Sequence, residues 1–316
     1  MMERTDRHFR FLMRLITKRT LLYTEMVTAG AILHGNRDQL LEFDDSEHPV
    51  SLQLGGDDPA QLRDSIRLAE PYGYDEYDLN VGCPSDRVQN GNFGACLMAR
   101  PDHVRRLVEA MKDATNRPVT VKHRIGIRGR ESFEQLVEFV RTVNEAGPAR
   151  FSVHARIAIL EGLSPKDNRN VPPLRYEDVY ALKREFPGVP IVINGGIETL
   201  DAVEEHLTHV DGVMIGRAAY DHPWLFRDVD HRFFGDNGPP ATRREVLDRY
   251  SPYIDHWQQQ GRSLHGLLRP ILGLFSFEPG TRRFKQRLSG RLDPSLAASV
   301  LVARAIEHLT DEVLDG

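Results

Sequence analysis

The sequence predicts an α/β protein: a TIM-type (β/α)8 barrel followed by a small C-terminal helical bundle. Three observations support this prediction. Apolar, β-branched runs alternate with helical patterns along the first 234 residues, a polar residue ends nearly every apolar run, and the alternation stops at a turn-rich segment. A chain of 316 residues, 40% of them hydrophobic, is long enough to bury such a core.

The expected strands are seven short runs of apolar and β-branched residues. They lie at 21–26, 50–54, 76–80, 119–122, 151–154, 189–194 and 212–216. Several segments between them carry apolar residues at intervals of three and four, which is typical of helices that cover a sheet with one face. These helices are expected at 8–17, 59–69, 101–114, 132–146, 176–186 and 199–207.

A closed barrel of this type needs eight strands, one more than the sequence offers. Because the helical pattern at 8–17 starts so close to Met1, the first strand is expected upstream of the sequence. Two explanations stay open: a misassigned start codon, and a fragment with an open seam.

The turn-rich segment 235–240 is expected to link the barrel, 1–234, to a helical domain, 235–316. Helices are expected there at 245–260, 264–275, 281–288 and 294–309. Between positions 261 and 291 there are seven Lys or Arg residues and one acid, Glu278, although the whole chain has a formal net charge of −5. We interpret this segment as a phosphate-contacting surface. The alternative is a solvated helix face, which normally mixes both signs.

The cysteine content argues against a metal centre and a disulfide framework. Cys83 and Cys96 show neither metal-ligand nor redox-motif spacing, so a reducing cytosol is the expected compartment. The N terminus lacks the basic region and apolar run of a signal peptide, and no run approaches about 18 apolar residues. We therefore expect a soluble, cytoplasmic protein without a membrane segment.

Polar residues end the expected strands, whereas a strand buried in a parallel sheet should be apolar throughout. They are Glu25, Gln53, Asn80, Lys122, His154, Asn194 and, after the last strand, Gly216 followed by Arg217. Because the C-terminal ends of parallel strands meet at one face of a barrel, we expect these side chains to surround a ligand.

Cys83 follows one of these strands, in the segment 80–85 with the sequence Asn-Val-Gly-Cys-Pro-Ser. This position places a reactive thiol at the open end of the barrel and makes it a candidate catalyst. The alternative is a small, buried apolar group, which is the usual role of a lone cysteine.

The turns after the last two strands, at 194–196 and 216–217, match the phosphate site of barrels, where backbone N–H groups approach a phosphate closely. Gln53 and Lys122 are placed to contact the edge of a flat heterocycle, and a buried lysine suits the negative charge of a reduced flavin. A Schiff-base lysine is the alternative for Lys122.

Taken in order, these motifs resemble those of the tRNA-dihydrouridine synthase family. The similar segments cover almost the whole chain and lie at 23–26, 53–56, 80–85, 122–126, 154–156, 194–196 and 216–217. Segments 86–91 and 163–169 resemble the A-type subfamily.

The resemblance implies an FMN enzyme that uses NADPH to reduce the C5=C6 bond of D-loop uridines, about positions 20 and 20a of tRNA. Cys83 would donate a proton to C5, since a thiol with an ordinary pKa of about 8.5 is mostly protonated at pH 7. Asn80 would contact the uracil edge.

The resemblance also implies roles for cofactor- and tRNA-binding residues. The flavin ring and ribityl chain would be held by Gln53, Lys122 and His154. The FMN phosphate would be held by Asn194, Gly195, Gly196, Gly216 and Arg217. The tRNA would be contacted by Lys166, Arg169, Arg282 and Lys285.

Two other functions stay open. Another FMN-containing barrel reductase would share the flavin residues but act on a small molecule, and it would have no use for a basic helical domain. A barrel that had lost catalysis would only bind tRNA, although Cys83, Lys122 and His154 speak against that loss. No stable protein partner is expected.

Overall fold

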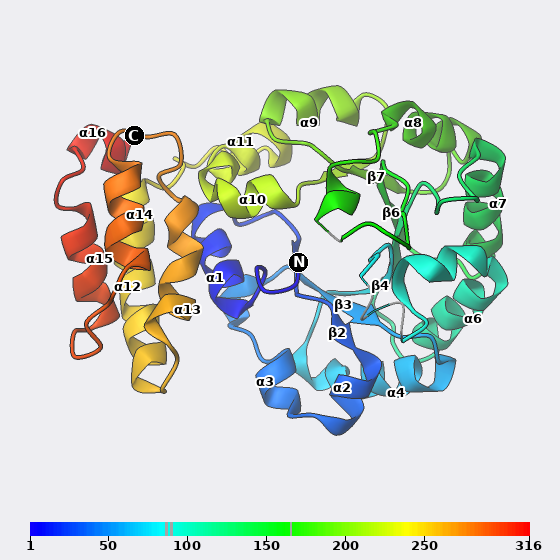
Figure 1. The fold of residues 1–316 in the computed structure, drawn as a ribbon, viewed down its shortest axis with the longest axis horizontal. Helices are drawn as coiled ribbons and strands as arrows, with labels where there is room; N and C mark the ends of the chain where they lie inside the picture. The colour runs from blue at the N-terminus through cyan, green and yellow to red at the C-terminus, as the bar shows by residue number, and fades with distance from the viewer. Residues whose placement is uncertain (86–87, 89–90, 165) are drawn as a thin grey trace. The chain divides into compact units, whose positions relative to one another are not determined.

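The computed structural model describes every residue of the chain except 86, 87, 89, 90 and 165 (Figure 1). Those five residues belong to the two segments that resemble the A-type subfamily, 86–91 and 163–169, so the resemblance at these five positions lies outside the described residues. Figure 1 shows a curled sheet with helices along its outer side.

Parallel strands form this sheet in the order β1-β3-β4-β5-β6-β7-β8, with β2 beside β3. The strands among the described residues are β1 (Leu22–Tyr23), β2 (Val27–Thr28), β3 (Val50–Gly55), β4 (Glu76–Val81), β5 (Val119–Arg124), β6 (Arg150–His154), β7 (Ile191–Asn194) and β8 (Gly212–Met214). The order follows the chain, as expected for a barrel sheet built from successive βα units. The predicted fold class is confirmed by this sheet together with the helical C-terminal part.

The predicted strand at 21–26 is wrong as a single element, because the chain forms two short strands there, β1 and β2. Between them the Thr24 hydroxyl accepts the backbone N–H of Gln53 at 3.0 Å and donates to the carbonyl of Glu25 at 2.7 Å. A side-chain hydroxyl thus replaces ladder hydrogen bonds at this point, and the regular strand is interrupted.

Helices follow the strands where the apolar spacing predicts them. They are α4 (Pro59–Ala69), α6 (Pro101–Lys112), α7 (Phe133–Asn144), α8 (Tyr176–Glu185) and α9 (Leu200–Leu207), and Figure 1 shows them outside the sheet. Local signals fix their starts: Asp58 caps α4 ahead of a proline, and Ser132 with Gln135 forms a capping box at α7. Two short helices, α2 (Ala29–His34) and α3 (Arg37–Leu41), were not predicted from the sequence.

The described chain divides into two compact units. The first contains residue 1, 23–43 and 48–216, and the second contains 2–22, 44–47 and 217–316. The expected domain boundary at 234 and 235 does not coincide with this division and stays a prediction.

Helix α1 (Arg7–Ile16), expected on the outside of the barrel, belongs to the second unit. There the ring of Phe11 stacks on Tyr253 of α12 (Arg243–Gln259), with centroids 3.8 Å apart. The Arg10 guanidinium also donates to the buried carboxylate of Glu47 at 2.7 Å.

The other helices of the second unit are α10 (Arg217–Asp221), α11 (Val229–Phe234), α13 (Leu264–Leu268), α14 (Thr281–Ser289), α15 (Ala298–Ile306) and α16 (Asp311–Asp315). The predicted helix at 264–275 continues beyond α13 as a 3-10 helix, η6 (Arg269–Gly273), which contains Pro270, a residue without a backbone N–H. Helix α15 starts later than predicted, because Asp293 forms a turn with Ser295. No helix among the described residues is long and apolar enough to cross a membrane.

Candidate active site

Neighbouring strands bring the predicted site residues of the first unit into register. Gln53 lies opposite Asp78, Asn80 opposite Lys122, and Arg124 opposite His154. His154 in turn lies opposite Asn194. Because residues paired in register point to the same side of a sheet, these side chains form a row across β3 to β7.

Cys83 lies in a turn that the side chain of Asn80 holds. The Asn80 Oδ1 atom accepts the backbone N–H groups of Gly82 at 3.0 Å and Cys83 at 2.9 Å. Cys83 is half-buried and unpaired with another cysteine, and its Sγ lies 3.5 Å from Ser85 Oγ. The strand-end amide therefore fixes the backbone that carries the thiol.

A second segment supports the same turn from the other side. The Cys83 carbonyl accepts the N–H of Ala95 at 2.9 Å, and the preceding Gly94 has φ +75°. A Cβ atom on Gly94 would lie 2.6 Å from the Cys83 carbonyl oxygen. Only glycine meets both the conformation and the close approach.

We expect Gly94→Ala to lower the free energy of unfolding by about 2–4 kcal/mol, because the new methyl group collides with the Cys83 backbone and φ is left-handed. Gly129→Ala is the matched control: its φ is +84° but a Cβ would meet nothing within 4 Å, so we expect a loss of about 1 kcal/mol. Urea unfolding measures both. Equal losses would show that the contact with Cys83 adds nothing.

The amides of Asn80 and Gln53 continue into a chain of hydrogen bonds. Asn80 Nδ2 donates to Gln53 Oε1 at 2.8 Å, and Gln53 Nε2 donates to Asp78 Oδ2 at 2.8 Å. The other oxygen of Asp78 accepts the Thr120 hydroxyl at 2.9 Å. This chain, Asp78–Gln53–Asn80, ends at the Cys83 turn; contacts of its amides with a flavin or a uracil stay predictions.

Asp78 is fully buried, and sequence analysis missed it. Burial raises the pKa of its carboxyl to about 6, although hydrogen bonds from Gln53 and Thr120 and the charge of Lys122 pull the pKa down. The sequence does contain a signal for Asp78: Glu76, Asp78 and Asn80 alternate with apolar residues along β4, so their side chains point to the same side of the sheet.

Lys122 has a pKa lowered to about 8, chiefly because burial disfavours its charged form. The charge of Asp78 raises this pKa, whereas Arg124 lowers it. Asp78 and Lys122 are thus electrostatic neighbours without a direct ion pair. Among the described residues, none accepts a hydrogen bond from the Lys122 ammonium or forms an ion pair with it, so this group is available to an anionic or electron-rich ligand.

Arg124 is a further residue that the sequence analysis missed. Its buried guanidinium donates to the carbonyls of Gly82 at 2.9 Å, Ile157 at 2.9 Å and Asn168 at 3.0 Å. Burial lowers its pKa to about 10. Arg124 therefore joins the Cys83 turn to the loop that carries Lys166 and Arg169.

A buried ionic cluster lies on the same side of the strands as the site residues, nearer their N-terminal ends. Arg150 donates to Glu76 at 2.7 Å and to the Tyr23 hydroxyl at 2.7 Å, and Ser51 donates to Glu76 at 2.9 Å. From the sequence, polar side chains were expected only where strands end. Polar side chains also lie nearer the N-terminal ends of the strands, and the fold tolerates these buried charges because they are paired.

Among the predicted phosphate-binding residues, Gly195 and Gly196 are closely packed by neighbouring side chains. Gly195 and Gly196 have φ of +121° and +69°, and a Cβ on Gly196 would lie 2.6 Å from Leu174 Cδ1. Asn194 Nδ2 donates to the Met214 carbonyl at 2.7 Å. Around Gly216, by contrast, a Cβ would meet only one atom, at 3.8 Å. Arg217, the next residue, begins α10 and belongs to the second unit.

The four predicted tRNA-contacting residues are divided between the units. Lys166 and Arg169 are exposed in the first unit, beside the buried Asn168 that anchors their loop to the Ile159 backbone. Arg282 and Lys285 lie on α14 in the second unit. Glu278, the single acid of segment 261–291, is paired with the buried Arg243 at 2.5 Å.

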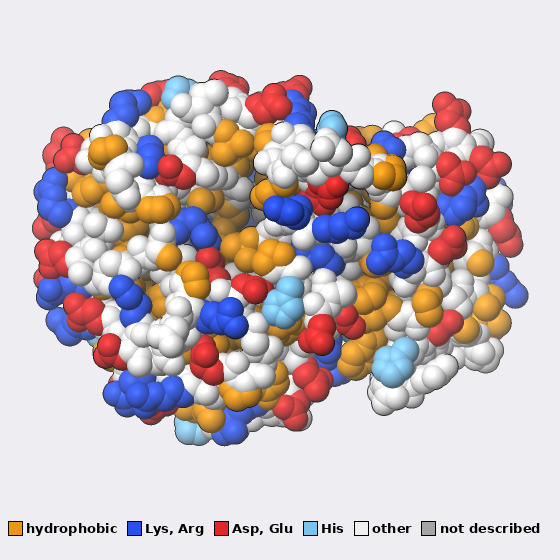
Figure 2. Space-filling model, turned by 180° about the vertical axis from the view of Figure 1, so that it is seen from behind, with side chains coloured by type: hydrophobic (Ala, Val, Ile, Leu, Met, Phe, Trp, Pro, Cys, Tyr) orange, Lys and Arg blue, Asp and Glu red, His pale blue; other side chains and the backbone are white. Residues whose placement is uncertain are grey.

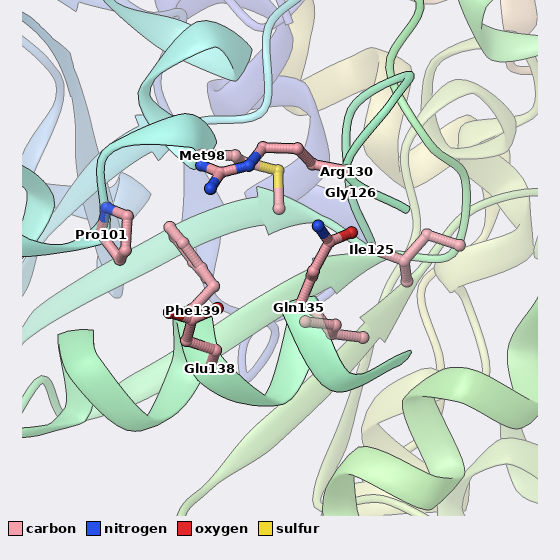
Figure 3. Close-up of a pocket in the computed structure, with 9 residues that line it drawn as sticks. Met98, Pro101, Ile125, Gly126, Arg130, Gln135, Glu138 and Phe139 are labelled. Carbon is pink, nitrogen blue, oxygen red and sulfur yellow. The ribbon is translucent and has the colours of Figure 1, made fainter. Parts of the chain in front are cut away.

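A hollow on the outer side of β5 is separate from this row. It is lined by η3 (Gly94–Ala99), the start of α6 and one face of α7, and includes Met98, Pro101, Gly126, Gln135 and Phe139 (Figure 3). No predicted site residue lines it.

The face shown in Figure 2 carries Lys and Arg interspersed with Asp and Glu.

Comparisons with known proteins agree with one another. A family model described as dihydrouridine synthase (Dus) matches residues 1–310. A Pseudomonas aeruginosa protein named tRNA-dihydrouridine(20/20a) synthase is 57% identical over 289 residues, covering 92% of this chain and 87% of that protein. Proteins of the same name from Synechocystis sp. (54% identical, covering 95% of this chain and 89% of that protein) and Vibrio cholerae (48%, covering 98% and 94%) are also similar.

One solved structure with a similar fold is a 2-naphthoyl-CoA reductase in complex with 2-naphthoyl-CoA. It superposes with a TM-score of 0.54 at 10% identity, and the match covers 71% of this chain and 46% of that chain. This chain thus spans about half the length of that structure. At so low an identity the likeness concerns the fold alone.

Proposed function

The chain belongs to the dihydrouridine synthase family, and on that premise we propose that Cys83 is the proton donor in the reduction of D-loop uridines 20 and 20a of tRNA. The enzyme is an oxidoreductase that reduces uridines in tRNA and depends on a flavin. We further propose that this flavin is FMN and that NADPH is the reductant. Free thiols at both cysteines suit a cytosolic reaction.

The observation that carries this proposal is the placement of the Cys83 turn beside Lys122 in one row of strand ends. The Lys122 side chain is half-buried, its pKa is lowered, and no hydrogen bond or ion pair of its ammonium is found among the described residues. An electron-rich heterocycle suits such an ammonium, and the turn at Gly216, where a Cβ would meet one atom at 3.8 Å, is less crowded than the turn at Gly195 and Gly196, which suits a phosphate. These residues fit FMN: Gln53, Lys122 and His154 would hold its ring and ribityl chain, and Asn194, Gly195, Gly196, Gly216 and Arg217 its phosphate.

FMN, when bound, supplies the hydride that the uracil receives at C6. Reduction of the C5=C6 bond then requires one proton at C5. Cys83 Sγ provides it: the S–H bond breaks, a C–H bond forms at C5, and the thiolate is reprotonated from solvent. Asn80 holds the backbone that carries this thiol.

A uridine inside folded tRNA must leave its stack before it reaches the strand ends. Contacts to the RNA backbone offset that cost, and we propose Lys166, Arg169, Arg282 and Lys285 for them. The paired state of Glu278 supports this, because it leaves no free carboxylate to repel phosphates from segment 261–291.

The proposal is tested with purified protein, NADPH and unmodified tRNA transcripts under anaerobic conditions. We expect dihydrouridine at positions 20 and 20a by mass spectrometry and none when both uridines are replaced by cytidine. Extraction of the bound flavin identifies FMN or FAD. A flavin-containing protein that oxidises NADPH but leaves tRNA unchanged would favour the small-molecule reductase instead.

We expect Arg282→Ala and Lys285→Ala each to lower the slope of log K against log salt concentration for tRNA binding by roughly 0.7–0.9, because each removes one phosphate contact. The control is Arg244→Ala, because Arg244 is already paired with Asp311 at 2.6 Å and Asp315 at 2.7 Å. Its slope should equal that of the wild type. If all three variants behave alike, α14 does not contact phosphates.

A further inference from the structure

Phe277 is the most exposed large hydrophobic residue among those the structure describes. The residue is 89% exposed, whereas the next, Val171, is 62% exposed. A single exposed apolar residue is ordinary on a protein surface. Phe277 is unusual because its φ is also +73°, in the left-handed region that disfavours any residue with a Cβ. Two independent costs therefore fall on one residue.

The loop around Phe277 is held firmly by hydrogen bonds. The Ser276 hydroxyl donates to the Asp221 carbonyl at 2.7 Å, and the N–H of Glu278 donates to the Phe275 carbonyl at 3.1 Å. A Cβ on Gly273 would lie 2.7 Å from Pro223 Cδ, so η6, which precedes the loop, packs tightly against Pro223. The surrounding fold thus fixes the exposed ring in its strained conformation.

The surroundings of Phe277 are aromatic and cationic. The His222 ring lies 5.0 Å away at 90°, and burial lowers the pKa of His222, which keeps this imidazole neutral at pH 7. Lys285 Nζ lies 3.5 Å from the hydroxyl of Ser276, the neighbour of Phe277. The carboxylate of Glu278, its other neighbour, is neutralised by Arg243.

We propose that Phe277 is a stacking platform for an unpaired base of the bound tRNA, with Lys285 contacting the adjacent backbone. Proteins bind unpaired nucleotides by combining an exposed aromatic face with nearby cations, which is the arrangement found here. The inference rests on the proposed function, since it concerns the same tRNA.

The first test is the affinity for an unmodified tRNA transcript. We expect Phe277→Ala to weaken binding about 10-fold, and Phe277→Tyr to restore it, because a tyrosine ring also stacks. Phe234→Ala is the matched control, because Phe234 is an aromatic residue of the same unit that is 44% exposed. It should bind like the wild type.

Salt dependence separates stacking from charge. Since stacking releases no counterions, Phe277→Ala should shift the plot of log K against log salt downward without changing its slope, unlike Lys285→Ala. At saturating tRNA, the kcat of Phe277→Ala should equal the wild-type value, because only binding is weakened. Phe277→Gly should unfold at higher urea than the wild type, because glycine accepts positive φ, while it binds tRNA as weakly as Phe277→Ala.

A direct readout is Phe277→Trp, whose added fluorescence should be quenched when tRNA binds. Wild-type tRNA affinity in Phe277→Ala overturns the inference. If Phe277→Ala also changes the sedimentation of the protein while tRNA affinity is unchanged, a second copy covers the ring in the wild type. A wild-type protein that neither binds nor reduces tRNA refutes the proposed function itself. The two failures are therefore distinguishable.

Discussion

Cys83→Ala should lower dihydrouridine formation by about 10²–10⁴-fold, the range typical of a lost general acid, while flavin content and tRNA affinity stay at wild-type values. The substitution keeps the backbone contacts of the turn, because Asn80 and Ala95 bond only to the backbone of residue 83. It removes the Sγ proton and little else. Single-turnover formation of dihydrouridine from prereduced enzyme measures the effect.

Cys96→Ala is the control for Cys83, because the Cys96 thiol lies on η3 and donates to the carbonyl of Phe93 at 3.1 Å. It should turn over like the wild type. Cys83→Ser should fall between the two, since a hydroxyl is a weaker acid than a thiol. Wild-type turnover in Cys83→Ala would remove the thiol from the mechanism.

Asp78→Asn should stabilise the fold and impair the enzyme. The folded-state pKa of Asp78, about 6, is raised above the ordinary value of about 3.9, so its contribution to stability is present below pH 4 and is lost as the pH rises through 6. The neutral amide avoids this cost. We expect a gain of about 3 kcal/mol at pH 7.5 that falls to about half at pH 5, measured by urea unfolding.

Asp78→Ala should lower turnover by about 10²-fold, because Gln53 and Thr120 lose their acceptor and the Cys83 turn loses its anchor. Asp78→Asn can still accept the Gln53 hydrogen bond, so we expect a smaller loss, caused by the missing charge beside Lys122.

The turn itself can be observed, since the chain has two cysteines and 15N-cysteine labelling gives two amide signals. In Asp78→Ala the Cys83 amide should exchange faster with solvent while Cys96 stays unchanged, and in Asp78→Asn both should match the wild type. An unchanged Cys83 signal in Asp78→Ala would show that the hydrogen-bond chain does not hold the turn.

The sequence predicted the sheet well because parallel strands and their covering helices leave local patterns. Six of the seven expected strands and the helices between them form where the apolar spacing placed them. The exception, 21–26, depends on a hydrogen bond between Thr24 and Gln53, which are far apart in the chain. Likewise, α1 has the pattern of an outer helix, and only tertiary contacts assign it to the second unit.

The sequence alone determined which strands carry polar ends and that a thiol follows β4, because local spacing fixes both. It could not show which polar groups bond to one another. Adjacent residues of β5 illustrate this: Lys122 and Arg124 share a face with the site, whereas His123 turns outward onto the rings of Phe139 and Phe151. The chain from Asp78 through Gln53 and Asn80 to Cys83 joins two strands, and only strand register decides such contacts.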